Sequence, residues 1–130
     1  MLKDILYIDD STLDLHILKR LQDKYHCFKS CETICDPLTA LVQLKTKALN
    51  NDKLPDIIFL DLRMPIFDGY QFLDHFESMY TQFNQEIWVH ILTSSTSPKD
   101  ISRCKQYPHV RCYHIKPIAI ETLLNNEDLH

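Results

Sequence analysis

Short apolar runs, each followed directly by a polar side chain, are the feature that most limits how this chain can fold. The polar residues that follow these runs are Asp9, Asp10, Asp61, Thr93 and Lys116. Runs of this length, separated by segments with helical periodicity, are typical of the buried strands of a parallel sheet. Because ligands bind beyond the carboxyl ends of parallel strands, we expect these five side chains to meet in one crevice.

The spacing of the runs predicts five strands that alternate with five helices. The expected strands cover residues 5–9, 28–34, 56–61, 87–92 and 110–115. The second of them alternates polar and apolar residues, a pattern typical of a strand at the edge of a sheet. The sequence therefore predicts an α/β fold, a (βα)5 doubly wound parallel sheet with strand order 2-1-3-4-5.

The expected helices differ in the strength of their apolar stripes. Residues 98–107 offer only Ile101 and Cys104 as inward candidates, so we expect this helix to be weakly anchored. The stripes of the first three helices are formed by Leu13, Ile17, Leu18 and Leu21; by Leu38, Leu41, Val42 and Leu49; and by Phe72, Phe76, Met79, Tyr80 and Phe83.

Length and charge restrict the class of protein. The 130 residues suffice for one domain with its own core, and we expect that domain to span residues 1–130. The net charge of −4 and the lack of a basic cluster argue against nucleic acid as a partner. The N-terminus has no long apolar segment, so we expect no signal peptide and no membrane span.

The five cysteines are expected to be reduced thiols. Cys27, Cys31 and Cys35 recur every four residues around an expected strand, so neighbours would lie about 13 Å apart, too far for a disulfide. The histidines show no metal-ligand spacing, and we interpret His90 and His114 as ordinary strand residues. A cytoplasmic location is the simplest expectation.

The segment LDLRMPIFDG at residues 60–69, together with the residues at the strand ends, resembles the receiver domain of bacterial two-component response regulators. The resemblance covers nearly the whole chain. It implies a flavodoxin-like, CheY-like fold and a single receiver domain without an output domain. Whether the protein is a monomer or a weak homodimer stays open.

Three aspartates in one crevice repel each other, so either one binds a proton or a divalent cation binds. Oxygen ligands on loops suit Mg²⁺. The resemblance implies the same ion, with Asp10 and Asp61 as ligands, Asp9 acting partly through water, and the Arg63 backbone carbonyl as a further ligand. The Arg63 side chain takes no part in that contact, so its identity is expected to be free to vary.

A carboxylate acts as a nucleophile in some phosphoryl transfers and then forms an aspartyl phosphate. Asp61 is our candidate phosphoacceptor, because it ends the central strand at the switch point of the sheet. The resemblance implies that a sensor histidine kinase donates the phosphoryl group. Lys116 and Thr93 would then contact phosphoryl oxygens, with positioning and charge neutralisation doing most of the catalysis.

The resemblance also implies a conformational switch read by a partner protein. On phosphorylation, Thr93 would move toward the new anion, and Tyr113 would rotate inward to fill the space. The face built from the fourth helix, fifth strand and fifth helix would change. Pro65, Gly69 and Pro117 are expected to have structural roles, and the Lys116–Pro117 peptide is expected to be cis.

Alternative functions stay open for the same residues. Asp9 and Asp10 alone are an ordinary turn and helix cap, and only the joint occurrence of the motifs favours a site. In one alternative, the chain passes its phosphoryl group on to a histidine phosphotransfer protein. In another, it serves as an unphosphorylated scaffold. A haloacid-dehalogenase-like phosphatase is disfavoured, because it needs an aspartate where Arg63 stands. A flavodoxin-like FMN carrier is also disfavoured, because Asp9 and Asp10 would repel the phosphate of FMN. We therefore expect no enzyme that turns over small molecules.

Overall fold

The computed structural model describes residues 2–130, and within them five parallel strands form one sheet in the order β2-β1-β3-β4-β5. This order confirms the predicted fold class. The strands of the sheet are β1 (Asp4–Ile8), β2 (Ser30–Ile34), β3 (Ile57–Leu60), β4 (Trp88–Thr93) and β5 (Val110–Ile115). Every residue of β3 is buried, whereas β2 at the edge has none that is fully buried.

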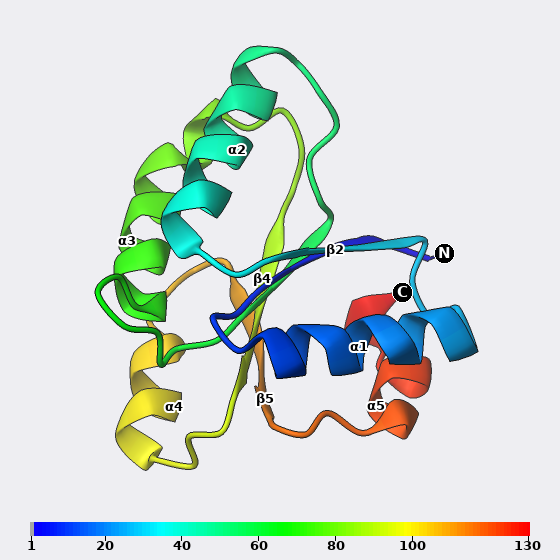
Figure 1. Ribbon diagram of the computed structural model, residues 1–130. Helices are drawn as coiled ribbons and strands as arrows, with labels where there is room; N and C mark the ends of the chain where they lie inside the picture. Colours follow the sequence, from blue (N-terminus) through cyan, green and yellow to red (C-terminus); the bar gives the residue numbers. More distant parts are fainter. Residues whose placement is uncertain (1) are drawn as a thin grey trace.

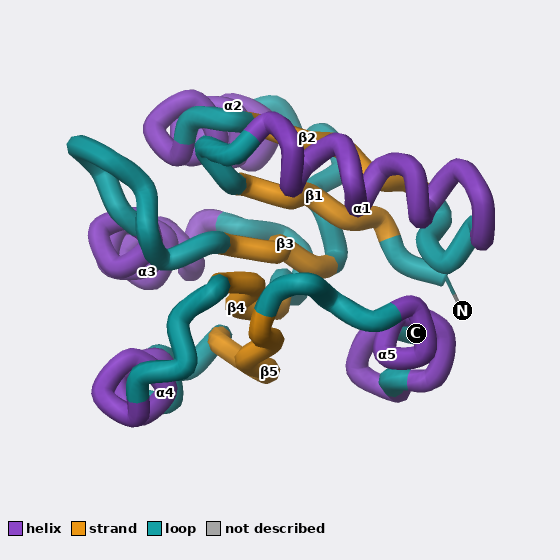
Figure 2. The backbone as a smooth tube through the Cα atoms, turned by 60° about the horizontal axis from the view of Figure 1, so that its bottom comes forward, coloured by secondary structure: helices purple, strands orange, loops and turns teal. Residues whose placement is uncertain are grey.

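Helices cover both faces of the sheet. Figure 2 shows α1 and α5 on one face, and α2, α3 and α4 on the other. The chain can be followed from β1 at the N-terminus to α5 near the C-terminus in Figure 1. The helices are α1 (Thr12–Tyr25), α2 (Pro37–Leu49), α3 (Gly69–Met79), α4 (Pro98–Cys104) and α5 (Ile120–Asn125), with short 3-10 turns η1 (Tyr80–Gln82) and η2 (Glu127–Leu129).

Side-chain caps fix where three helices begin. Ser11 caps α1 by accepting the Asp14 backbone N–H, and Asp36 caps α2 in the same way. Asp68 caps α3, and Gln71 returns a contact to the Asp68 backbone N–H, which completes a capping box. Because α1 and α3 begin directly after the loops that follow β1 and β3, these caps also hold the two loops in place.

The predicted stripes of α1 and α2 are partly wrong. Leu13 is 67% exposed and Ile17 is 44% exposed, whereas Leu18 is buried as predicted and Leu15, which the prediction left out, is buried as well. Both helices carry apolar residues on more than one side, so helical periodicity alone does not decide which side meets the sheet. In α2, Leu41 is buried as predicted, but the remaining buried residues are Pro37, Ala40 and Leu44, while Leu38, Val42 and Leu49 are exposed.

The stripe predicted for α3 is confirmed as core. Phe72 and Phe76 are fully buried, and Met79, Tyr80 and Phe83 pack against the same cluster. The helix predicted over 98–107 is shorter, since α4 ends at Cys104 and a turn follows. The five cysteines are free thiols, as predicted. In the part of the chain that the structure describes, no helix is long and apolar enough to cross a membrane.

Candidate functional site

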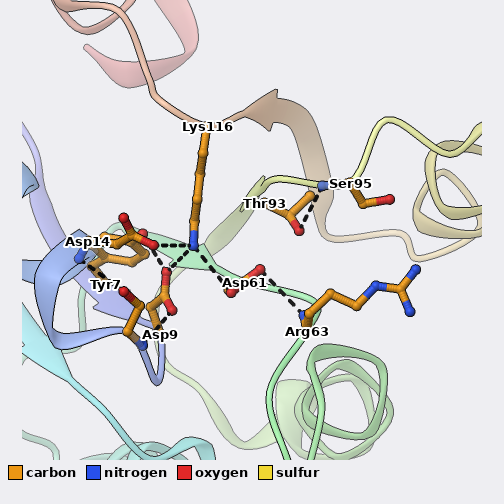
Figure 3. A network of polar contacts seen from close by, with 9 residues as sticks. Tyr7, Asp9, Asp14, Asp61, Arg63, Thr93, Ser95 and Lys116 are labelled. Carbon is orange, nitrogen blue, oxygen red and sulfur yellow. Dashed lines mark hydrogen bonds and ion pairs between the residues drawn. The ribbon is translucent and has the colours of Figure 1, made fainter.

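The predicted convergence of polar residues is observed at the carboxyl edge of the sheet. Asp9 follows β1, Asp61 follows β3, and Lys116 follows β5. Carboxylate oxygens of Asp9, Asp10 and Asp61 lie within 4.8 Å of one another. Asp9 and Asp61 are buried, whereas Asp10 is exposed. Thr93, the last residue of β4, is fully buried beside them (Figure 3).

The Lys116 ammonium offsets part of the negative charge of this acidic cluster. Its Nζ lies 2.6 Å from Asp9 Oδ2, 2.8 Å from Asp14 Oδ2 and 3.3 Å from Asp61 Oδ2. Figure 3 shows the lysine reaching across to all three carboxylates. Burial lowers the pKa of Lys116, but hydrogen bonds to Asp14 and Asp9 outweigh burial and raise it overall. The lysine therefore stays charged.

Asp14 is a member of this site that the sequence did not reveal. It lies in the first turn of α1, four residues after Asp10, and not at the end of an apolar run. The hydrogen bond from Lys116 lowers the pKa of Asp14. Asp14 therefore competes with Asp61 for the same ammonium group.

Asp61 is placed where its negative charge is unfavourable. Burial, and then the charge of Asp9, raise its pKa, while Lys116 acts in the opposite direction. Its Oδ1 accepts a long hydrogen bond of 3.4 Å from the Arg63 backbone N–H. A carboxylate in this position gains stability from any added cation or from protonation.

The carboxylate oxygens of Asp9 already accept hydrogen bonds, so they are less available to a metal ion than those of Asp10. Tyr7 donates its hydroxyl to Asp9 Oδ2 at 2.7 Å, and the Ser11 backbone N–H donates to Oδ1 at 2.9 Å. Asp10, in contrast, is open to solvent. The donor set is made of carboxylate oxygens with one exposed side, which fits Mg²⁺, an ion that keeps several of its waters.

Gly69 allows the loop after β3 to pass close to the start of α3. A Cβ at this position would lie 2.5 Å from the Asp61 carbonyl oxygen and 2.8 Å from Leu62 Cα. The Gly69 N–H donates to the Leu62 carbonyl at 3.1 Å. The glycine is needed for this approach, which agrees with its place in the predicted motif.

Two prolines flank the site. Within the loop after β3, the Pro65 carbonyl accepts the Phe67 N–H at 2.7 Å, and the intervening Ile66 has a φ of 68°. The Lys116–Pro117 peptide is cis, as the resemblance implied.

The Arg63 side chain, whose identity we expected to be free to vary, forms an ion pair with α4. Its Nη2 lies 2.6 Å from Asp100 Oδ2, on the far side of the chain from the acidic cluster. Asp100 is only 8% exposed, and Tyr70 donates its hydroxyl to Oδ1 at 2.6 Å. The Ser95 hydroxyl also donates to Asp100. Polar contacts of Asp100 therefore anchor α4, which has few apolar contacts of its own.

Thr93 and Tyr113, the two expected switch residues, both contact Ser95. The Tyr113 hydroxyl donates to the Ser95 carbonyl at 2.9 Å, and the Ser95 N–H donates to Thr93 Oγ1 at 3.4 Å. The half-buried Tyr113 ring packs against the core. Ser95 thus connects Thr93, Tyr113 and Asp100.

The comparison with known families decides the class of this protein. A sequence model described as the response regulator receiver domain matches residues 5–126. The chain belongs to this family. Receiver domains act in two-component signalling, where they accept phosphoryl groups and interact with histidine kinases and downstream effectors.

Individual relatives support the assignment. The probable methanogenesis regulatory protein FilR2 of Methanothrix harundinacea is 30% identical over 119 residues, which covers 92% of this receiver and 75% of that protein. A response regulator receiver protein of Dyadobacter fermentans has a TM-score of 0.80 and 27% identity, covering 93% and 91% of the two chains. The phosphorylated cyanobacterial phytochrome response regulator RcpA has a TM-score of 0.75 and 26% identity, covering 95% and 87%.

Proposed function

We propose that Asp61 accepts a phosphoryl group from the phosphohistidine of a sensor histidine kinase. The observation that carries the proposal is the position of Asp61, at the end of the central strand, with Lys116 Nζ 3.3 Å from one oxygen and the Arg63 N–H at the other. Phosphorylation of the similar protein RcpA supports it.

In the proposed transfer, a lone pair of an Asp61 oxygen forms the new O–P bond. The N–P bond of the phosphohistidine breaks, and its electron pair stays on the imidazole nitrogen, which then takes up a proton. Lys116 exchanges part of its contact with Asp14 and Asp9 for a phosphoryl oxygen. The Thr93 hydroxyl contacts another phosphoryl oxygen. These two residues position the group and offset its charge.

Mg²⁺ would be held by Asp10, Asp61 and the Arg63 backbone carbonyl, with Asp9 acting through water. When bound, the ion supplies positive charge next to the phosphoryl oxygens. The raised pKa of Asp61, caused first by burial and then by Asp9, supports a site that favours an added cation.

The readout of phosphorylation would begin at Ser95. Movement of Thr93 toward the phosphoryl group would disturb the Ser95 backbone, and the Ser95 carbonyl is the partner of the Tyr113 hydroxyl. Tyr113 would then repack, and the face formed by α4, β5 and α5 would present a changed surface to a downstream protein.

The test is the intact mass of the protein after incubation with acetyl phosphate and Mg²⁺, repeated with a panel of phosphorylated histidine kinases. We expect one labile phosphoryl adduct from at least one donor. The adduct should be absent from Asp61→Asn and from samples in chelator. Asp52→Asn, which changes an exposed aspartate outside the site, should be labelled like the wild type. An adduct that persists in Asp61→Asn, or no adduct from any donor, would overturn the proposal.

A further inference from the structure

A second cluster of metal-binding side chains lies on the face of the sheet that α1 and α5 cover. His90 comes from β4, and Cys112 and His114 come from β5. One ligating atom from each of the three residues lies within 4.8 Å of the other two. His90 Nδ1 is only 3.0 Å from His114 Nε2. This cluster shares no residue with the acidic site.

An irregular strand pairing creates the cluster. Val89 pairs with Val110, but the next residue, His90, pairs with Cys112, so Arg111 is an extra residue in β5. Because side chains alternate between the faces of a strand, regular pairing would turn Cys112 and His114 to the opposite face from His90. Bulges of this kind often redirect side chains at functional sites.

The C-terminal 3-10 turn brings a carboxylate next to one member of this cluster. The Cys112 thiol donates to Asp128 Oδ2 at 3.3 Å, and Asp128 belongs to η2. The Asp128 side chain is 45% exposed and is paired only loosely with Arg111, at 3.7 Å. Asp128 lies outside the group of three close ligand atoms, so its side chain would have to turn toward the two histidines to bind the same ion.

His90 is fully buried, yet its Nε2 atom has no hydrogen-bond partner among the described residues. Most buried polar atoms in proteins do have one, so this atom is unusual, but it is not the ring nitrogen that faces His114, which is Nδ1. Imidazole nitrogens are common metal ligands, and the neutral ring is the form that binds.

We propose that His90, Cys112, His114 and Asp128 form a binding site for a zinc-type transition metal ion. Two imidazoles, a thiolate and a carboxylate are ligands that Zn²⁺ takes in tetrahedral sites, with bonds of about 2.0–2.3 Å. Such bonds place neighbouring ligand atoms roughly 3.3–3.8 Å apart. The ligand atoms of His90, Cys112 and His114 would therefore close by about 1 Å or less around the ion, whereas Asp128 lies outside this group and would have to move farther.

The charges of this site balance. The thiol proton is released to solvent when the ion binds, and the thiolate and the Asp128 carboxylate then offset the two positive charges. The acidic site has only oxygen ligands and favours Mg²⁺, so ligand chemistry separates the two sites. A bound ion would also connect β4 and β5 to the C-terminal turn.

The test uses Co²⁺ as a spectroscopic substitute, with the full chain in excess Mg²⁺ to occupy the acidic site. We expect one equivalent of Co²⁺ to give tetrahedral absorption bands and a thiolate-to-cobalt charge-transfer band, both removed by one equivalent of Zn²⁺. Cys112→Ser should abolish the charge-transfer band, whereas Cys35→Ser, an exposed cysteine, should retain it. Asp61→Asn should also retain it, which separates this site from the phosphoacceptor.

Thermal unfolding in chelator checks that each variant is folded. Asp128→Asn changes a surface residue, so it tests the site even if Cys112→Ser does not fold, and we expect it to weaken Zn²⁺ binding about tenfold. The absence of a charge-transfer band in the wild type would show an ordinary hydrogen-bonded histidine pair and overturn the proposal. A band that survives in Cys112→Ser would overturn it as well.

Discussion

Lys116 and Asp14 form an ion pair of 2.8 Å across 102 positions of sequence, so part of the lysine charge is directed to a carboxylate other than the proposed phosphoacceptor. The same ammonium lies farther from Asp61, at 3.3 Å. Part of the Lys116 charge must therefore be redirected when a phosphoryl group arrives.

Asp14→Asn is predicted to speed phosphorylation of Asp61. The substitution removes a competitor for Lys116, and a partly exposed ion pair contributes roughly 1 kcal/mol, which corresponds to about fivefold in rate. The measurement is the rate of acetyl phosphate labelling, followed by intact mass in Mg²⁺. Asp23→Asn, an exposed change on the same helix, should leave the rate unaltered. An unchanged or slower rate in Asp14→Asn would refute the competition.

Asp61→Asn is predicted to stabilise the metal-free protein at neutral pH. A carboxyl group whose pKa is raised in the folded state stabilises at low pH, and that contribution is lost as the pH rises through the folded pKa. The stability advantage of the variant should therefore be present at pH 7.5 and disappear near about pH 3. Urea unfolding in chelator across this range measures it. A stability difference that does not depend on pH would contradict the raised pKa of Asp61.

Asp100→Asn should show the opposite pH dependence. Hydrogen bonds from Ser95 and Tyr70 lower the pKa of Asp100, so its contribution is present above the unfolded pKa and is lost as the pH falls through the folded pKa. We expect a loss of about 2 kcal/mol at pH 7, since a charged acceptor with several donors is removed. The difference in stability between variant and wild type should disappear as the pH falls below about 4. Equal stability of variant and wild type at pH 7 would show that Asp100 does not anchor α4.

Gly69→Ala is predicted to destabilise the fold by about 2 kcal/mol, although alanine is the better helix former. The added methyl group meets the Asp61 carbonyl oxygen and the Leu62 backbone, neither of which can move alone. Labelling of Asp61 should slow as well. Ser78→Ala, an exposed change on α3, is the matched control for chemical denaturation. Wild-type stability in Gly69→Ala would contradict the close approach.

The parts of the site at strand ends could be predicted from sequence. Asp61 and Lys116 follow apolar runs, and the rule that parallel strands bind ligands at their carboxyl ends places them together. Asp14 and Asp100 lie inside helices, where a charged residue is usually solvated, and no local pattern marks them. Their importance depends on which long side chains reach them from other elements.

The cluster of His90, Cys112 and His114 was hidden for a different reason. We interpreted His90 and His114 as ordinary strand residues, because their spacing in the sequence matches no ligand pattern. They share a face only because Arg111 is an extra residue in β5, and a shift of one residue reverses every side chain beyond it. The faces of α1 and α2 were hard to predict for a related reason, since Leu13 and Leu15 are equally apolar and only packing separates them.

The most direct test of phosphorylation at Asp61 is chemical trapping of the acyl phosphate with borohydride, followed by peptide mapping. Reduction converts a phosphorylated aspartate to homoserine. We expect homoserine at position 61 alone, dependent on both a phosphoryl donor and Mg²⁺. Homoserine at position 9, 10 or 14, or none at position 61 in protein that carries the phosphoryl adduct, would contradict the assignment of Asp61 as the phosphoacceptor.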